Sequence, residues 1–248
     1  MDSPRAWLSC HQPQPAARLR LYCFPYAGGG ASVYRNWGRG FSPTIEICAI
    51  QPPGREQRLA EKPFTQFSPY VEAIAAAIAP TLTLPYAFFG HSLGALAAFE
   101  CSRILRATTL SAPAALFVSG CRAPQVPFRD TQTCELSDEL FIEELRRLNG
   151  TPKEALEHPE LMALLLPLLR GDFSVYESYE YRPESPLECP IHAFGGTGDT
   201  RVTQFDLAAW GAETIGPSSV RMFPGDHFFL HGAQRAITQA MTLELQGV

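Results

Sequence analysis

The residues best suited to chemistry form the motif Gly90-His91-Ser92-Leu93-Gly94, in which one serine lies between two glycines. An apolar stretch precedes the motif and an Ala-rich stretch follows it. The pattern G-x-S-x-G between a strand and a helix is typical of a tight turn that projects the serine hydroxyl above a sheet. Side chains at the two glycine positions would collide across such a bend. We therefore predict that Ser92 is a nucleophile; the alternative is a glycine turn that serves packing alone.

A serine hydroxyl attacks efficiently only when a base removes its proton, and histidine is the commonest base. His227 follows a predicted strand and a Pro-Gly loop, so we expect it at the edge of the sheet where Ser92 lies. His231, four residues further on, is its rival. The other four histidines are placed less well, on the turn beside Ser92 (His91), within a predicted strand (His192), at the start of a helix (His158) and in the N-terminal segment (His11).

The base needs a carboxylate that fixes its tautomer and stabilises the imidazolium. Asp199 ends a Gly-rich loop that follows the predicted strand 191–194, so it leaves the same edge of the sheet as His227. We predict Asp199 as this acid, ahead of Asp226, Asp172 and Asp206. Ser92, Asp199 and His227 then follow the chain order Ser…Asp…His, which is the order of α/β-hydrolases.

Acyl transfer also needs N–H donors for the oxyanion that forms at the attacked carbonyl. The amide of Leu93, directly after the nucleophile, is the first candidate. The second is the amide of Ala27, because Gly28-Gly29-Gly30 lets the backbone after an early strand approach the serine closely. The alternative for this segment is a flexible glycine turn without a role in catalysis.

Short apolar segments that alternate with helical patterns must position these residues, and this alternation predicts an α/β fold with a mostly parallel central sheet flanked by helices. The predicted strands are 18–24, 45–50, 86–89, 114–119, 191–194 and 220–223, and the predicted helices outside the insertion are 70–79, 93–106 and 233–245. We expect residues 4–15 to be a loose tail.

Residues 122–187 interrupt the alternation with an almost purely helical pattern. Ser137 is the expected cap of a first helix that Asn149-Gly150 ends. A second helix should begin at Thr151 with a capping box to Glu154, and a third at His158-Pro159, where Pro167 should kink or split it. We interpret this insertion as a lid over the site within a single domain of residues 1–248; the alternative is stabilising decoration.

Composition narrows the class of protein. The chain has 248 residues and a net charge of −5 without a basic run, which argues against a nucleic-acid partner. No apolar stretch has the ~18 residues of a membrane span, and the N-terminus lacks a signal-peptide core. Seven scattered cysteines predict reduced, buried thiols, and no zinc-type spacing occurs. We expect a cytoplasmic protein without a metal or an organic cofactor.

Seven motifs together resemble the type II thioesterases, the free-standing editing hydrolases of polyketide and nonribosomal-peptide synthases. They are FPYAGGGASVYRNW, QPPGREQR, GHSLGALAAFE, LFVSGCRAP, LLRGDFSVYESYEY, GGTGD and GDHFFL, in order from about residue 21 to 231. The resemblance implies hydrolysis of acyl groups from the phosphopantetheine arm of acyl or peptidyl carrier proteins, with Ser92, Asp199 and His227 in the catalytic roles and 122–187 as the lid. It assigns no physical role to Arg55 of the PGR segment.

Other functions remain compatible with these residues. Esterases for small oxygen esters and acyltransferases use the same acyl-serine chemistry. A non-catalytic acyl-binding protein would have little need of a complete set of catalytic residues. The basic residues of the insertion could meet an acidic carrier protein, although a solvated helix face explains them more simply; they are Arg122, Arg129, Arg146 and Arg147. We expect a monomer.

Overall fold

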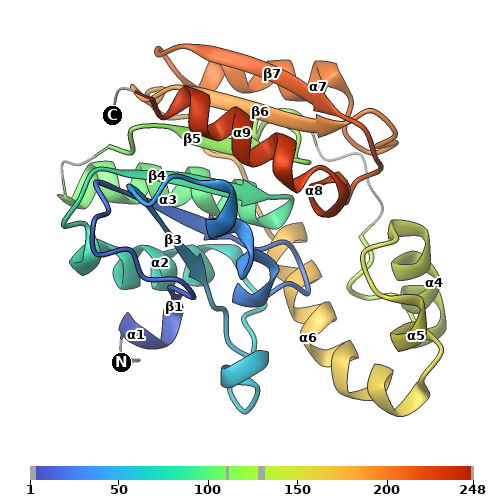
Figure 1. Ribbon diagram of the computed structural model, residues 1–248. Helices are drawn as coiled ribbons and strands as arrows, with labels where there is room; N and C mark the ends of the chain where they lie inside the picture. The colour runs from blue at the N-terminus through green and yellow to red at the C-terminus, as the bar shows by residue number, and fades with distance from the viewer. Residues whose placement is uncertain (1–3, 110–111, 128–131, 247–248) are drawn as a thin grey trace.

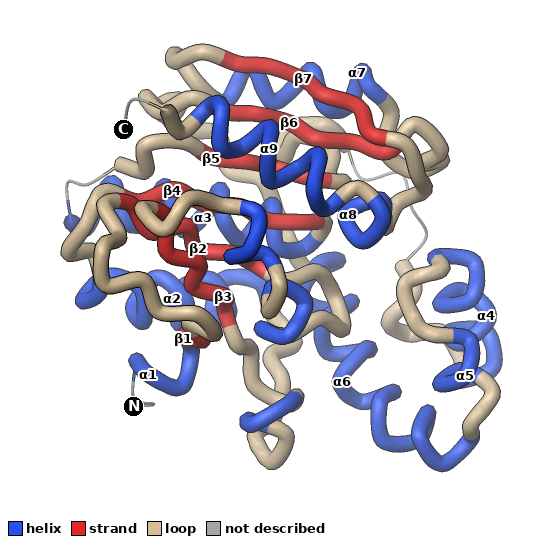
Figure 2. The backbone as a smooth tube through the Cα atoms, viewed as in Figure 1, coloured by secondary structure: helices blue, strands red, loops and turns tan. Residues whose placement is uncertain are grey.

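A seven-stranded sheet forms the centre of the computed structural model, which describes residues 4–109, 112–127 and 132–246. The strand order is β1-β3-β2-β4-β5-β6-β7; β1 is antiparallel to β3, and the other pairs are parallel (Figures 1 and 2). The predicted mostly parallel α/β sheet is confirmed. The strands are β1 (Leu8–Ser9), β2 (Leu19–Phe24), β3 (Ile45–Ile50), β4 (Tyr86–His91), β5 (Leu116–Ser119), β6 (Ile191–Gly196) and β7 (Ser218–Phe223).

Helices cover both faces of the sheet, so the central strands are buried on both sides and read as continuous apolar runs. Adjacent residues of β4 demonstrate this: Phe88 packs in the core that contains α2 and α3, and Phe89 packs in the opposite core with α9. The helices are α1 (Pro4–Trp7), α2 (Phe67–Ile78), α3 (Leu93–Thr109), α4 (Asp138–Leu148), α5 (Lys153–Leu156), α6 (Pro159–Glu177), α7 (Gln204–Ala208), α8 (Phe229–Gly232) and α9 (Gln234–Glu244).

The N-terminal segment departs from the expected loose tail. Residues 4–9 form α1 and β1, and Leu8 pairs with Ile50 of β3. Trp7 is buried, and the Arg58 guanidinium lies 4.4 Å from its ring centroid. An aromatic anchor and a two-residue strand carry too little periodicity to be recognised in a sequence, which explains why this prediction was wrong.

A disulfide joins Cys10 to Cys48, so the prediction of reduced thiols was wrong for these two cysteines. The antiparallel pairing of β1 with β3 is the physical reason, because it brings the two Cα atoms to 4.5 Å from each other. The other five cysteines are free thiols.

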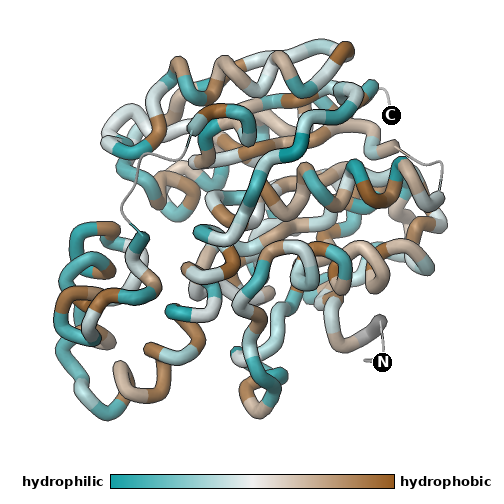
Figure 3. Tube along the Cα trace, turned by 180° about the vertical axis from the view of Figure 1, so that it is seen from behind, coloured by the Kyte–Doolittle hydropathy of each residue, from teal (hydrophilic) through white to brown (hydrophobic). Residues whose placement is uncertain are grey.

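The insertion between β5 and β6 contains α4, α5 and α6, which extend beside the sheet (Figure 1). Hydrophobic residues recur along these helices (Figure 3, lower left) and form their own core around Phe141 and Leu145. Ser137 caps α4 as predicted. The expected capping box at Thr151 is absent, since Pro152 is the N-cap residue of α5 and has no side-chain hydrogen bond there. Helix α6 is not split at Pro167.

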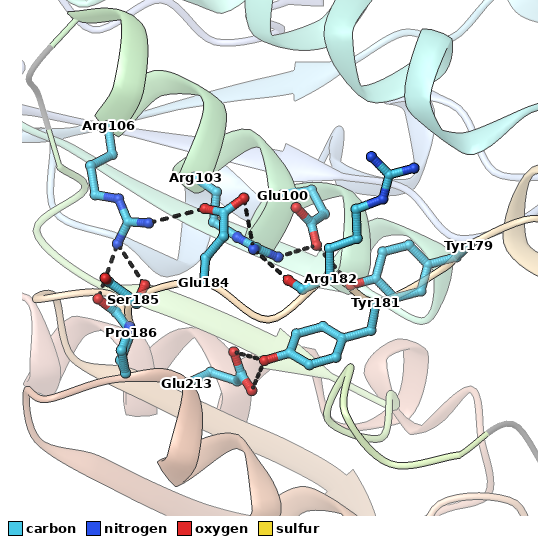
Figure 4. A network of polar contacts seen from close by, with 10 residues as sticks. All are labelled: Glu100, Arg103, Arg106, Tyr179, Tyr181, Arg182, Glu184, Ser185, Pro186 and Glu213. Atoms are coloured by element: carbon cyan, nitrogen blue, oxygen red, sulfur yellow. Dashed lines mark hydrogen bonds and ion pairs between the residues drawn. The ribbon is translucent and has the colours of Figure 1, made fainter.

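The segment that returns from α6 to β6 is bound to α3 by a polar network (Figure 4). Arg103 of α3 forms an ion pair of 2.8 Å with Glu184 and donates to the Arg182 carbonyl, while Arg106 donates to the Ser185 carbonyl. This network fixes one end of the insertion to the helix that begins directly after Ser92. It also contains Glu100, Tyr179, Tyr181, Pro186 and Glu213.

Candidate active site

Ser92 lies on the turn between β4 and α3 with a φ of +54°, a left-handed conformation that a serine rarely adopts. The sequence prediction that both glycines are required is confirmed. A Cβ at Gly90 would collide with the Gly94 carbonyl, and a Cβ at Gly94 would collide with the Phe24 carbonyl of β2. Strained backbone of this kind persists where the surrounding structure holds it, often at functional sites.

His227 and Asp199 lie on loops that leave the same edge of the sheet, after the neighbouring parallel strands β7 and β6. His227 Nδ1 and Asp199 Oδ2 are 2.8 Å apart. The other carboxylate oxygen of Asp199 accepts from the backbone amides of Arg201, at 2.8 Å, and Val202, at 3.3 Å. The Asp199 side chain is 1% exposed and that of His227 is 12% exposed, so the bond is shielded from water.

The environment of Asp199 favours its ionised form. Burial by itself would raise the pKa of Asp199, but the hydrogen bond and charge of His227, together with the two backbone amides, lower it. An ionised carboxylate only accepts hydrogen bonds, so Nδ1 of His227 carries the proton. In the neutral imidazole, Nε2 is then free to accept a proton.

Ser92, His227 and Ala27 line one small cavity of about 50 Å³. A larger cavity of about 410 Å³ lies beside it, between the Gly28-Gly29-Gly30 segment and the insertion, whose Leu165 and Leu168 form part of the wall. The two cavities have five lining residues in common, namely Tyr26, Ala27, Leu148, Phe173 and Phe228. An apolar chamber therefore adjoins the serine and histidine.

The two predicted oxyanion donors lie on different segments: Leu93 directly follows Ser92, and Ala27 lines the same cavity as Ser92. Leu93 is the first residue of α3, where backbone N–H groups have no partner within the helix. Ala27 follows β2 and precedes Gly28, whose φ is +84°. Gly29 N donates to the Tyr26 carbonyl at 2.8 Å, so residues 26–29 form a tight turn at the cavity wall.

The rival acids each have other partners. Asp226 accepts from the Phe228 amide at 2.8 Å and from Asn149 Nδ2 at 2.8 Å. Asp206 forms a capping box with Thr203 at the start of α7. Asp172 is paired with Arg55 and accepts a hydrogen bond from the Gly28 amide of the glycine turn. These contacts support the choice of Asp199.

The rival histidines also have structural contacts. His192 is buried in β6 and bonded to Ser219 at 2.8 Å, as predicted for a core histidine. His231 lies on α8, with Nε2 3.1 Å from the Tyr26 hydroxyl. His91 is fully buried beside Ser92, and its Nδ1 is 2.9 Å from Ser119 Oγ. Burial, and after it the charges of His227 and His231, hold the pKa of His91 well below its usual value, so it stays neutral.

Two residues at the site were missed from the sequence. The sequence patterns assigned no role to Arg55, and they offered Asp172 only as a possible carboxylate partner of the catalytic histidine. In the structure, Arg55 donates to the Gly29 carbonyl at 2.9 Å, and Asp172 accepts from the Gly28 amide at 2.6 Å. The available signal was an arginine in a Pro-Gly-Arg segment and an aspartate within an apolar helix, where an unpaired charge would be costly.

Two of the four basic residues of the insertion, Arg146 and Arg147, agree with a solvated helix face. Arg146 pairs with Glu143 at 3.1 Å, and Arg147 pairs with Glu144 at 2.7 Å, each one turn away on α4. Arg122 lines the small cavity. Arg129 lies outside the described residues.

No helix in the described part of the chain has both the length and the apolar character that crossing a bilayer requires.

A family model described as "Thioesterase domain" matches residues 19–242. Gramicidin S biosynthesis protein GrsT of Aneurinibacillus migulanus is 48% identical over 97% of this chain and 94% of its own. The type II thioesterase BorB from the borrelidin biosynthetic cluster superposes with a TM-score of 0.88, at 36% identity over 97% of this chain and 98% of BorB.

RedJ, a thioesterase from the prodiginine pathway of Streptomyces coelicolor, has a TM-score of 0.87 and is 38% identical over 94% of this chain and 88% of its own. These similarities extend over nearly the whole chain and include the region of the candidate site. The chain therefore belongs to the thioesterase family, among the type II thioesterases.

Proposed function

We propose that this enzyme hydrolyses acyl thioesters on the phosphopantetheine arm of acyl or peptidyl carrier proteins, and so clears stalled units from polyketide or nonribosomal-peptide synthases. His227, which is bonded to Asp199 and lines the same cavity as Ser92 in a chain of the thioesterase family, carries this proposal. GrsT is named for gramicidin S biosynthesis and BorB for the borrelidin biosynthetic cluster, and both names support the synthase context.

In the first half of the proposed reaction, Ser92 Oγ attacks the thioester carbonyl while His227 Nε2 removes its proton. Asp199 holds the imidazole by Nδ1 and stabilises the imidazolium that forms. The amides of Ala27 and Leu93 bind the oxyanion of the tetrahedral intermediate. The intermediate collapses, the C–S bond breaks, and the thiolate leaves with the proton from His227.

In the second half, a water molecule attacks the acyl-serine. His227 takes a proton from this water and returns it to Ser92 Oγ as the acid is released. The free acid leaves, and the enzyme regains its starting protonation state.

We further propose that residues 122–187 act as a lid and that the larger cavity holds the acyl chain. The walls of this cavity come from the glycine turn and from α4, α5 and α6. Because the cavity adjoins the smaller one that Ser92 lines, an acyl group bound in it would have its carbonyl near Ser92. We also propose that residues 1–248 form a single domain and that the protein is a monomer located in the cytoplasm. Size-exclusion chromatography with light scattering tests the monomer.

The decisive experiment uses a carrier protein bearing an acetyl-phosphopantetheine arm, incubated with the native enzyme or with Ser92→Ala and followed by intact mass. We expect the native enzyme to remove the acetyl group and the variant to leave it in place. If the native enzyme cleaves p-nitrophenyl acetate but not the carrier thioester, the small-ester esterase is the better reading. An acyl-binding protein would bind the loaded carrier equally in both forms without turnover, and an acyltransferase would need an added alcohol or amine.

A further inference from the structure

The turn that presents Ala27 has its orientation fixed by contacts on several sides. Gly29 N donates to the Tyr26 carbonyl, and Gly28 has a φ of +84° at the third position, which is the pattern of a type II turn. The Tyr26 carbonyl and the Ala27 N–H belong to one planar peptide unit and point in opposite directions. The turn therefore determines where the Ala27 N–H points.

Arg55 and Asp172 hold this turn from outside. Asp172 Oδ2 accepts from Gly28 N at 2.6 Å, and Arg55 Nη1 donates to the Gly29 carbonyl at 2.9 Å. The two side chains also bind each other with two parallel bonds, from Arg55 Nη1 to Oδ2 at 2.5 Å and from Nη2 to Oδ1 at 2.7 Å. Such fork-to-carboxylate pairing fixes geometry more strictly than a single ion contact.

The pair is buried within the protein, with Arg55 and Asp172 side chains 7% and 6% exposed. Burial by itself would lower the pKa of Arg55, but the charge of Asp172 and the hydrogen bonds to it outweigh burial, and the guanidinium stays charged. A buried ion pair often stabilises a fold no better than apolar residues of the same size. Stability alone therefore explains this pair poorly.

The two partners come from different parts of the chain. Arg55 follows β3 in the body of the protein, whereas Asp172 lies on α6 of the insertion. The neighbouring Leu169 of α6 lies so close to Gly28 that a Cβ there would be 2.7 Å from its Cδ2. The turn that carries Ala27 is thus held between the body and the insertion.

We propose that Arg55 and Asp172 are positioning residues for the reaction. They hold the 26–29 turn so that the Ala27 amide stays directed at the oxyanion. They also make this hydrogen-bond donor depend on the docking of α6. This inference rests on the proposed function, because it assumes that Ala27 binds the oxyanion. In this proposal both side chains act through the turn and not on the reacting carbonyl, although Arg55 also lines the larger cavity.

The test replaces the pair with apolar residues of similar size, Arg55→Met together with Asp172→Leu, so that no unpaired charge remains in the core. Turnover of the acetyl-carrier thioester and inhibition by an acyl trifluoromethyl ketone are measured, because this ketone forms a tetrahedral adduct with serine. We expect kcat to fall about 10- to 100-fold with KM little changed, and the inhibition constant of the ketone to rise by the factor lost in kcat/KM. Arg55→Lys keeps the charge but not both parallel bonds, so it should lie between the native enzyme and the double variant.

Glu46→Gln is the matched control, since Glu46 forms a largely buried ion pair of 2.7 Å with Arg20 at the opposite end of β2. We expect native kcat and native ketone inhibition from this variant. A double variant with native kcat and native ketone inhibition overturns the positioning role, and so does one whose loss of activity only matches its loss of folded protein. Activity that survives in Ser92→Ala instead overturns the serine mechanism itself, so the two failures are distinguishable.

Discussion

Asn149 Nδ2 donates a hydrogen bond of 2.8 Å to Asp226 Oδ2, so the residue that ends α4 of the insertion is bonded to the residue that precedes His227. Asn149 has a left-handed backbone with a φ of 57°. Next to it, a Cβ on Gly150 would collide with the Phe228 ring. The insertion therefore contacts the histidine loop through Asn149 and the glycine turn through Asp172.

Asn149→Gly should weaken substrate binding without slowing chemistry. Glycine adopts the left-handed conformation easily, so this change removes the side-chain bond and leaves the helix end intact. A lost bond worth about 1 kcal/mol in closing the insertion corresponds to an increase of about fivefold in KM at unchanged kcat. Asn149→Ala should raise KM similarly and also lower the free energy of unfolding by about 1 kcal/mol, because alanine disfavours a positive φ. Steady-state kinetics with the loaded carrier measure both constants. An unchanged KM in both variants would contradict a role of the Asn149–Asp226 bond in substrate binding.

Asp199→Asn should reduce kcat by about 10³- to 10⁴-fold while the protein stays folded. The amide retains the shape of the carboxylate but can hold the imidazole in the wrong tautomer and does not stabilise the imidazolium. Asp226→Asn, one residue before His227, is the control and should stay within about 10-fold of the native enzyme, because Asp226 bonds to the Phe228 amide and to Asn149. Comparable losses in the two variants would argue against Asp199 as the partner of His227.

Gly90→Ala should destabilise the fold strongly. Its methyl group would overlap the backbone carbonyl of Gly94, which cannot rotate away as a side chain could. We expect a loss of about 3 kcal/mol or more in the free energy of unfolding, measured by urea denaturation. Gly232→Ala is the matched control, since nothing lies within 4 Å of its added Cβ, and it should leave stability unchanged or slightly higher. A native-like stability of Gly90→Ala would show that the turn relaxes.

His91→Asn should flatten the acid side of the stability profile. The pKa of buried His91 lies well below 6.5, the usual value that it regains on unfolding. Between these two pKa values the unfolded chain binds more protons than the folded one, so stability falls as the pH decreases below about 6.5. Replacing this histidine should remove up to about 1.4 kcal/mol per pH unit of that slope between about pH 5 and 6.5.

Urea denaturation across this pH range provides the measurement. A residual slope should persist, because burial also lowers the pKa values of His192 and His231. A slope identical to that of the native protein would mean that His91 takes up its proton in the folded state as readily as in the unfolded chain.

Local patterns were sufficient for much of the fold. Apolar runs such as 45–50 became strands at the predicted positions, and Ser137 and Asn149 delimit α4 as their capping chemistry predicts. The N-terminal segment failed because β1 exists only through pairing with β3, and the Cys10–Cys48 bond depends on that pairing. A partner strand distant in sequence leaves no periodic signal in the segment itself.

Local sequence patterns were enough to predict that a serine on a glycine turn follows one parallel strand, and that an aspartate and a histidine follow two others. Because parallel strands end at a common edge, loop position alone brings Asp199 to His227. The side chains that hold the loops around these residues could be identified only from the folded chain. Arg55 meets Asp172 across 117 residues, and Asn149 meets Asp226 across 77. These contacts depend on how the insertion docks against the sheet, which is a property of packed surfaces and not of any local pattern.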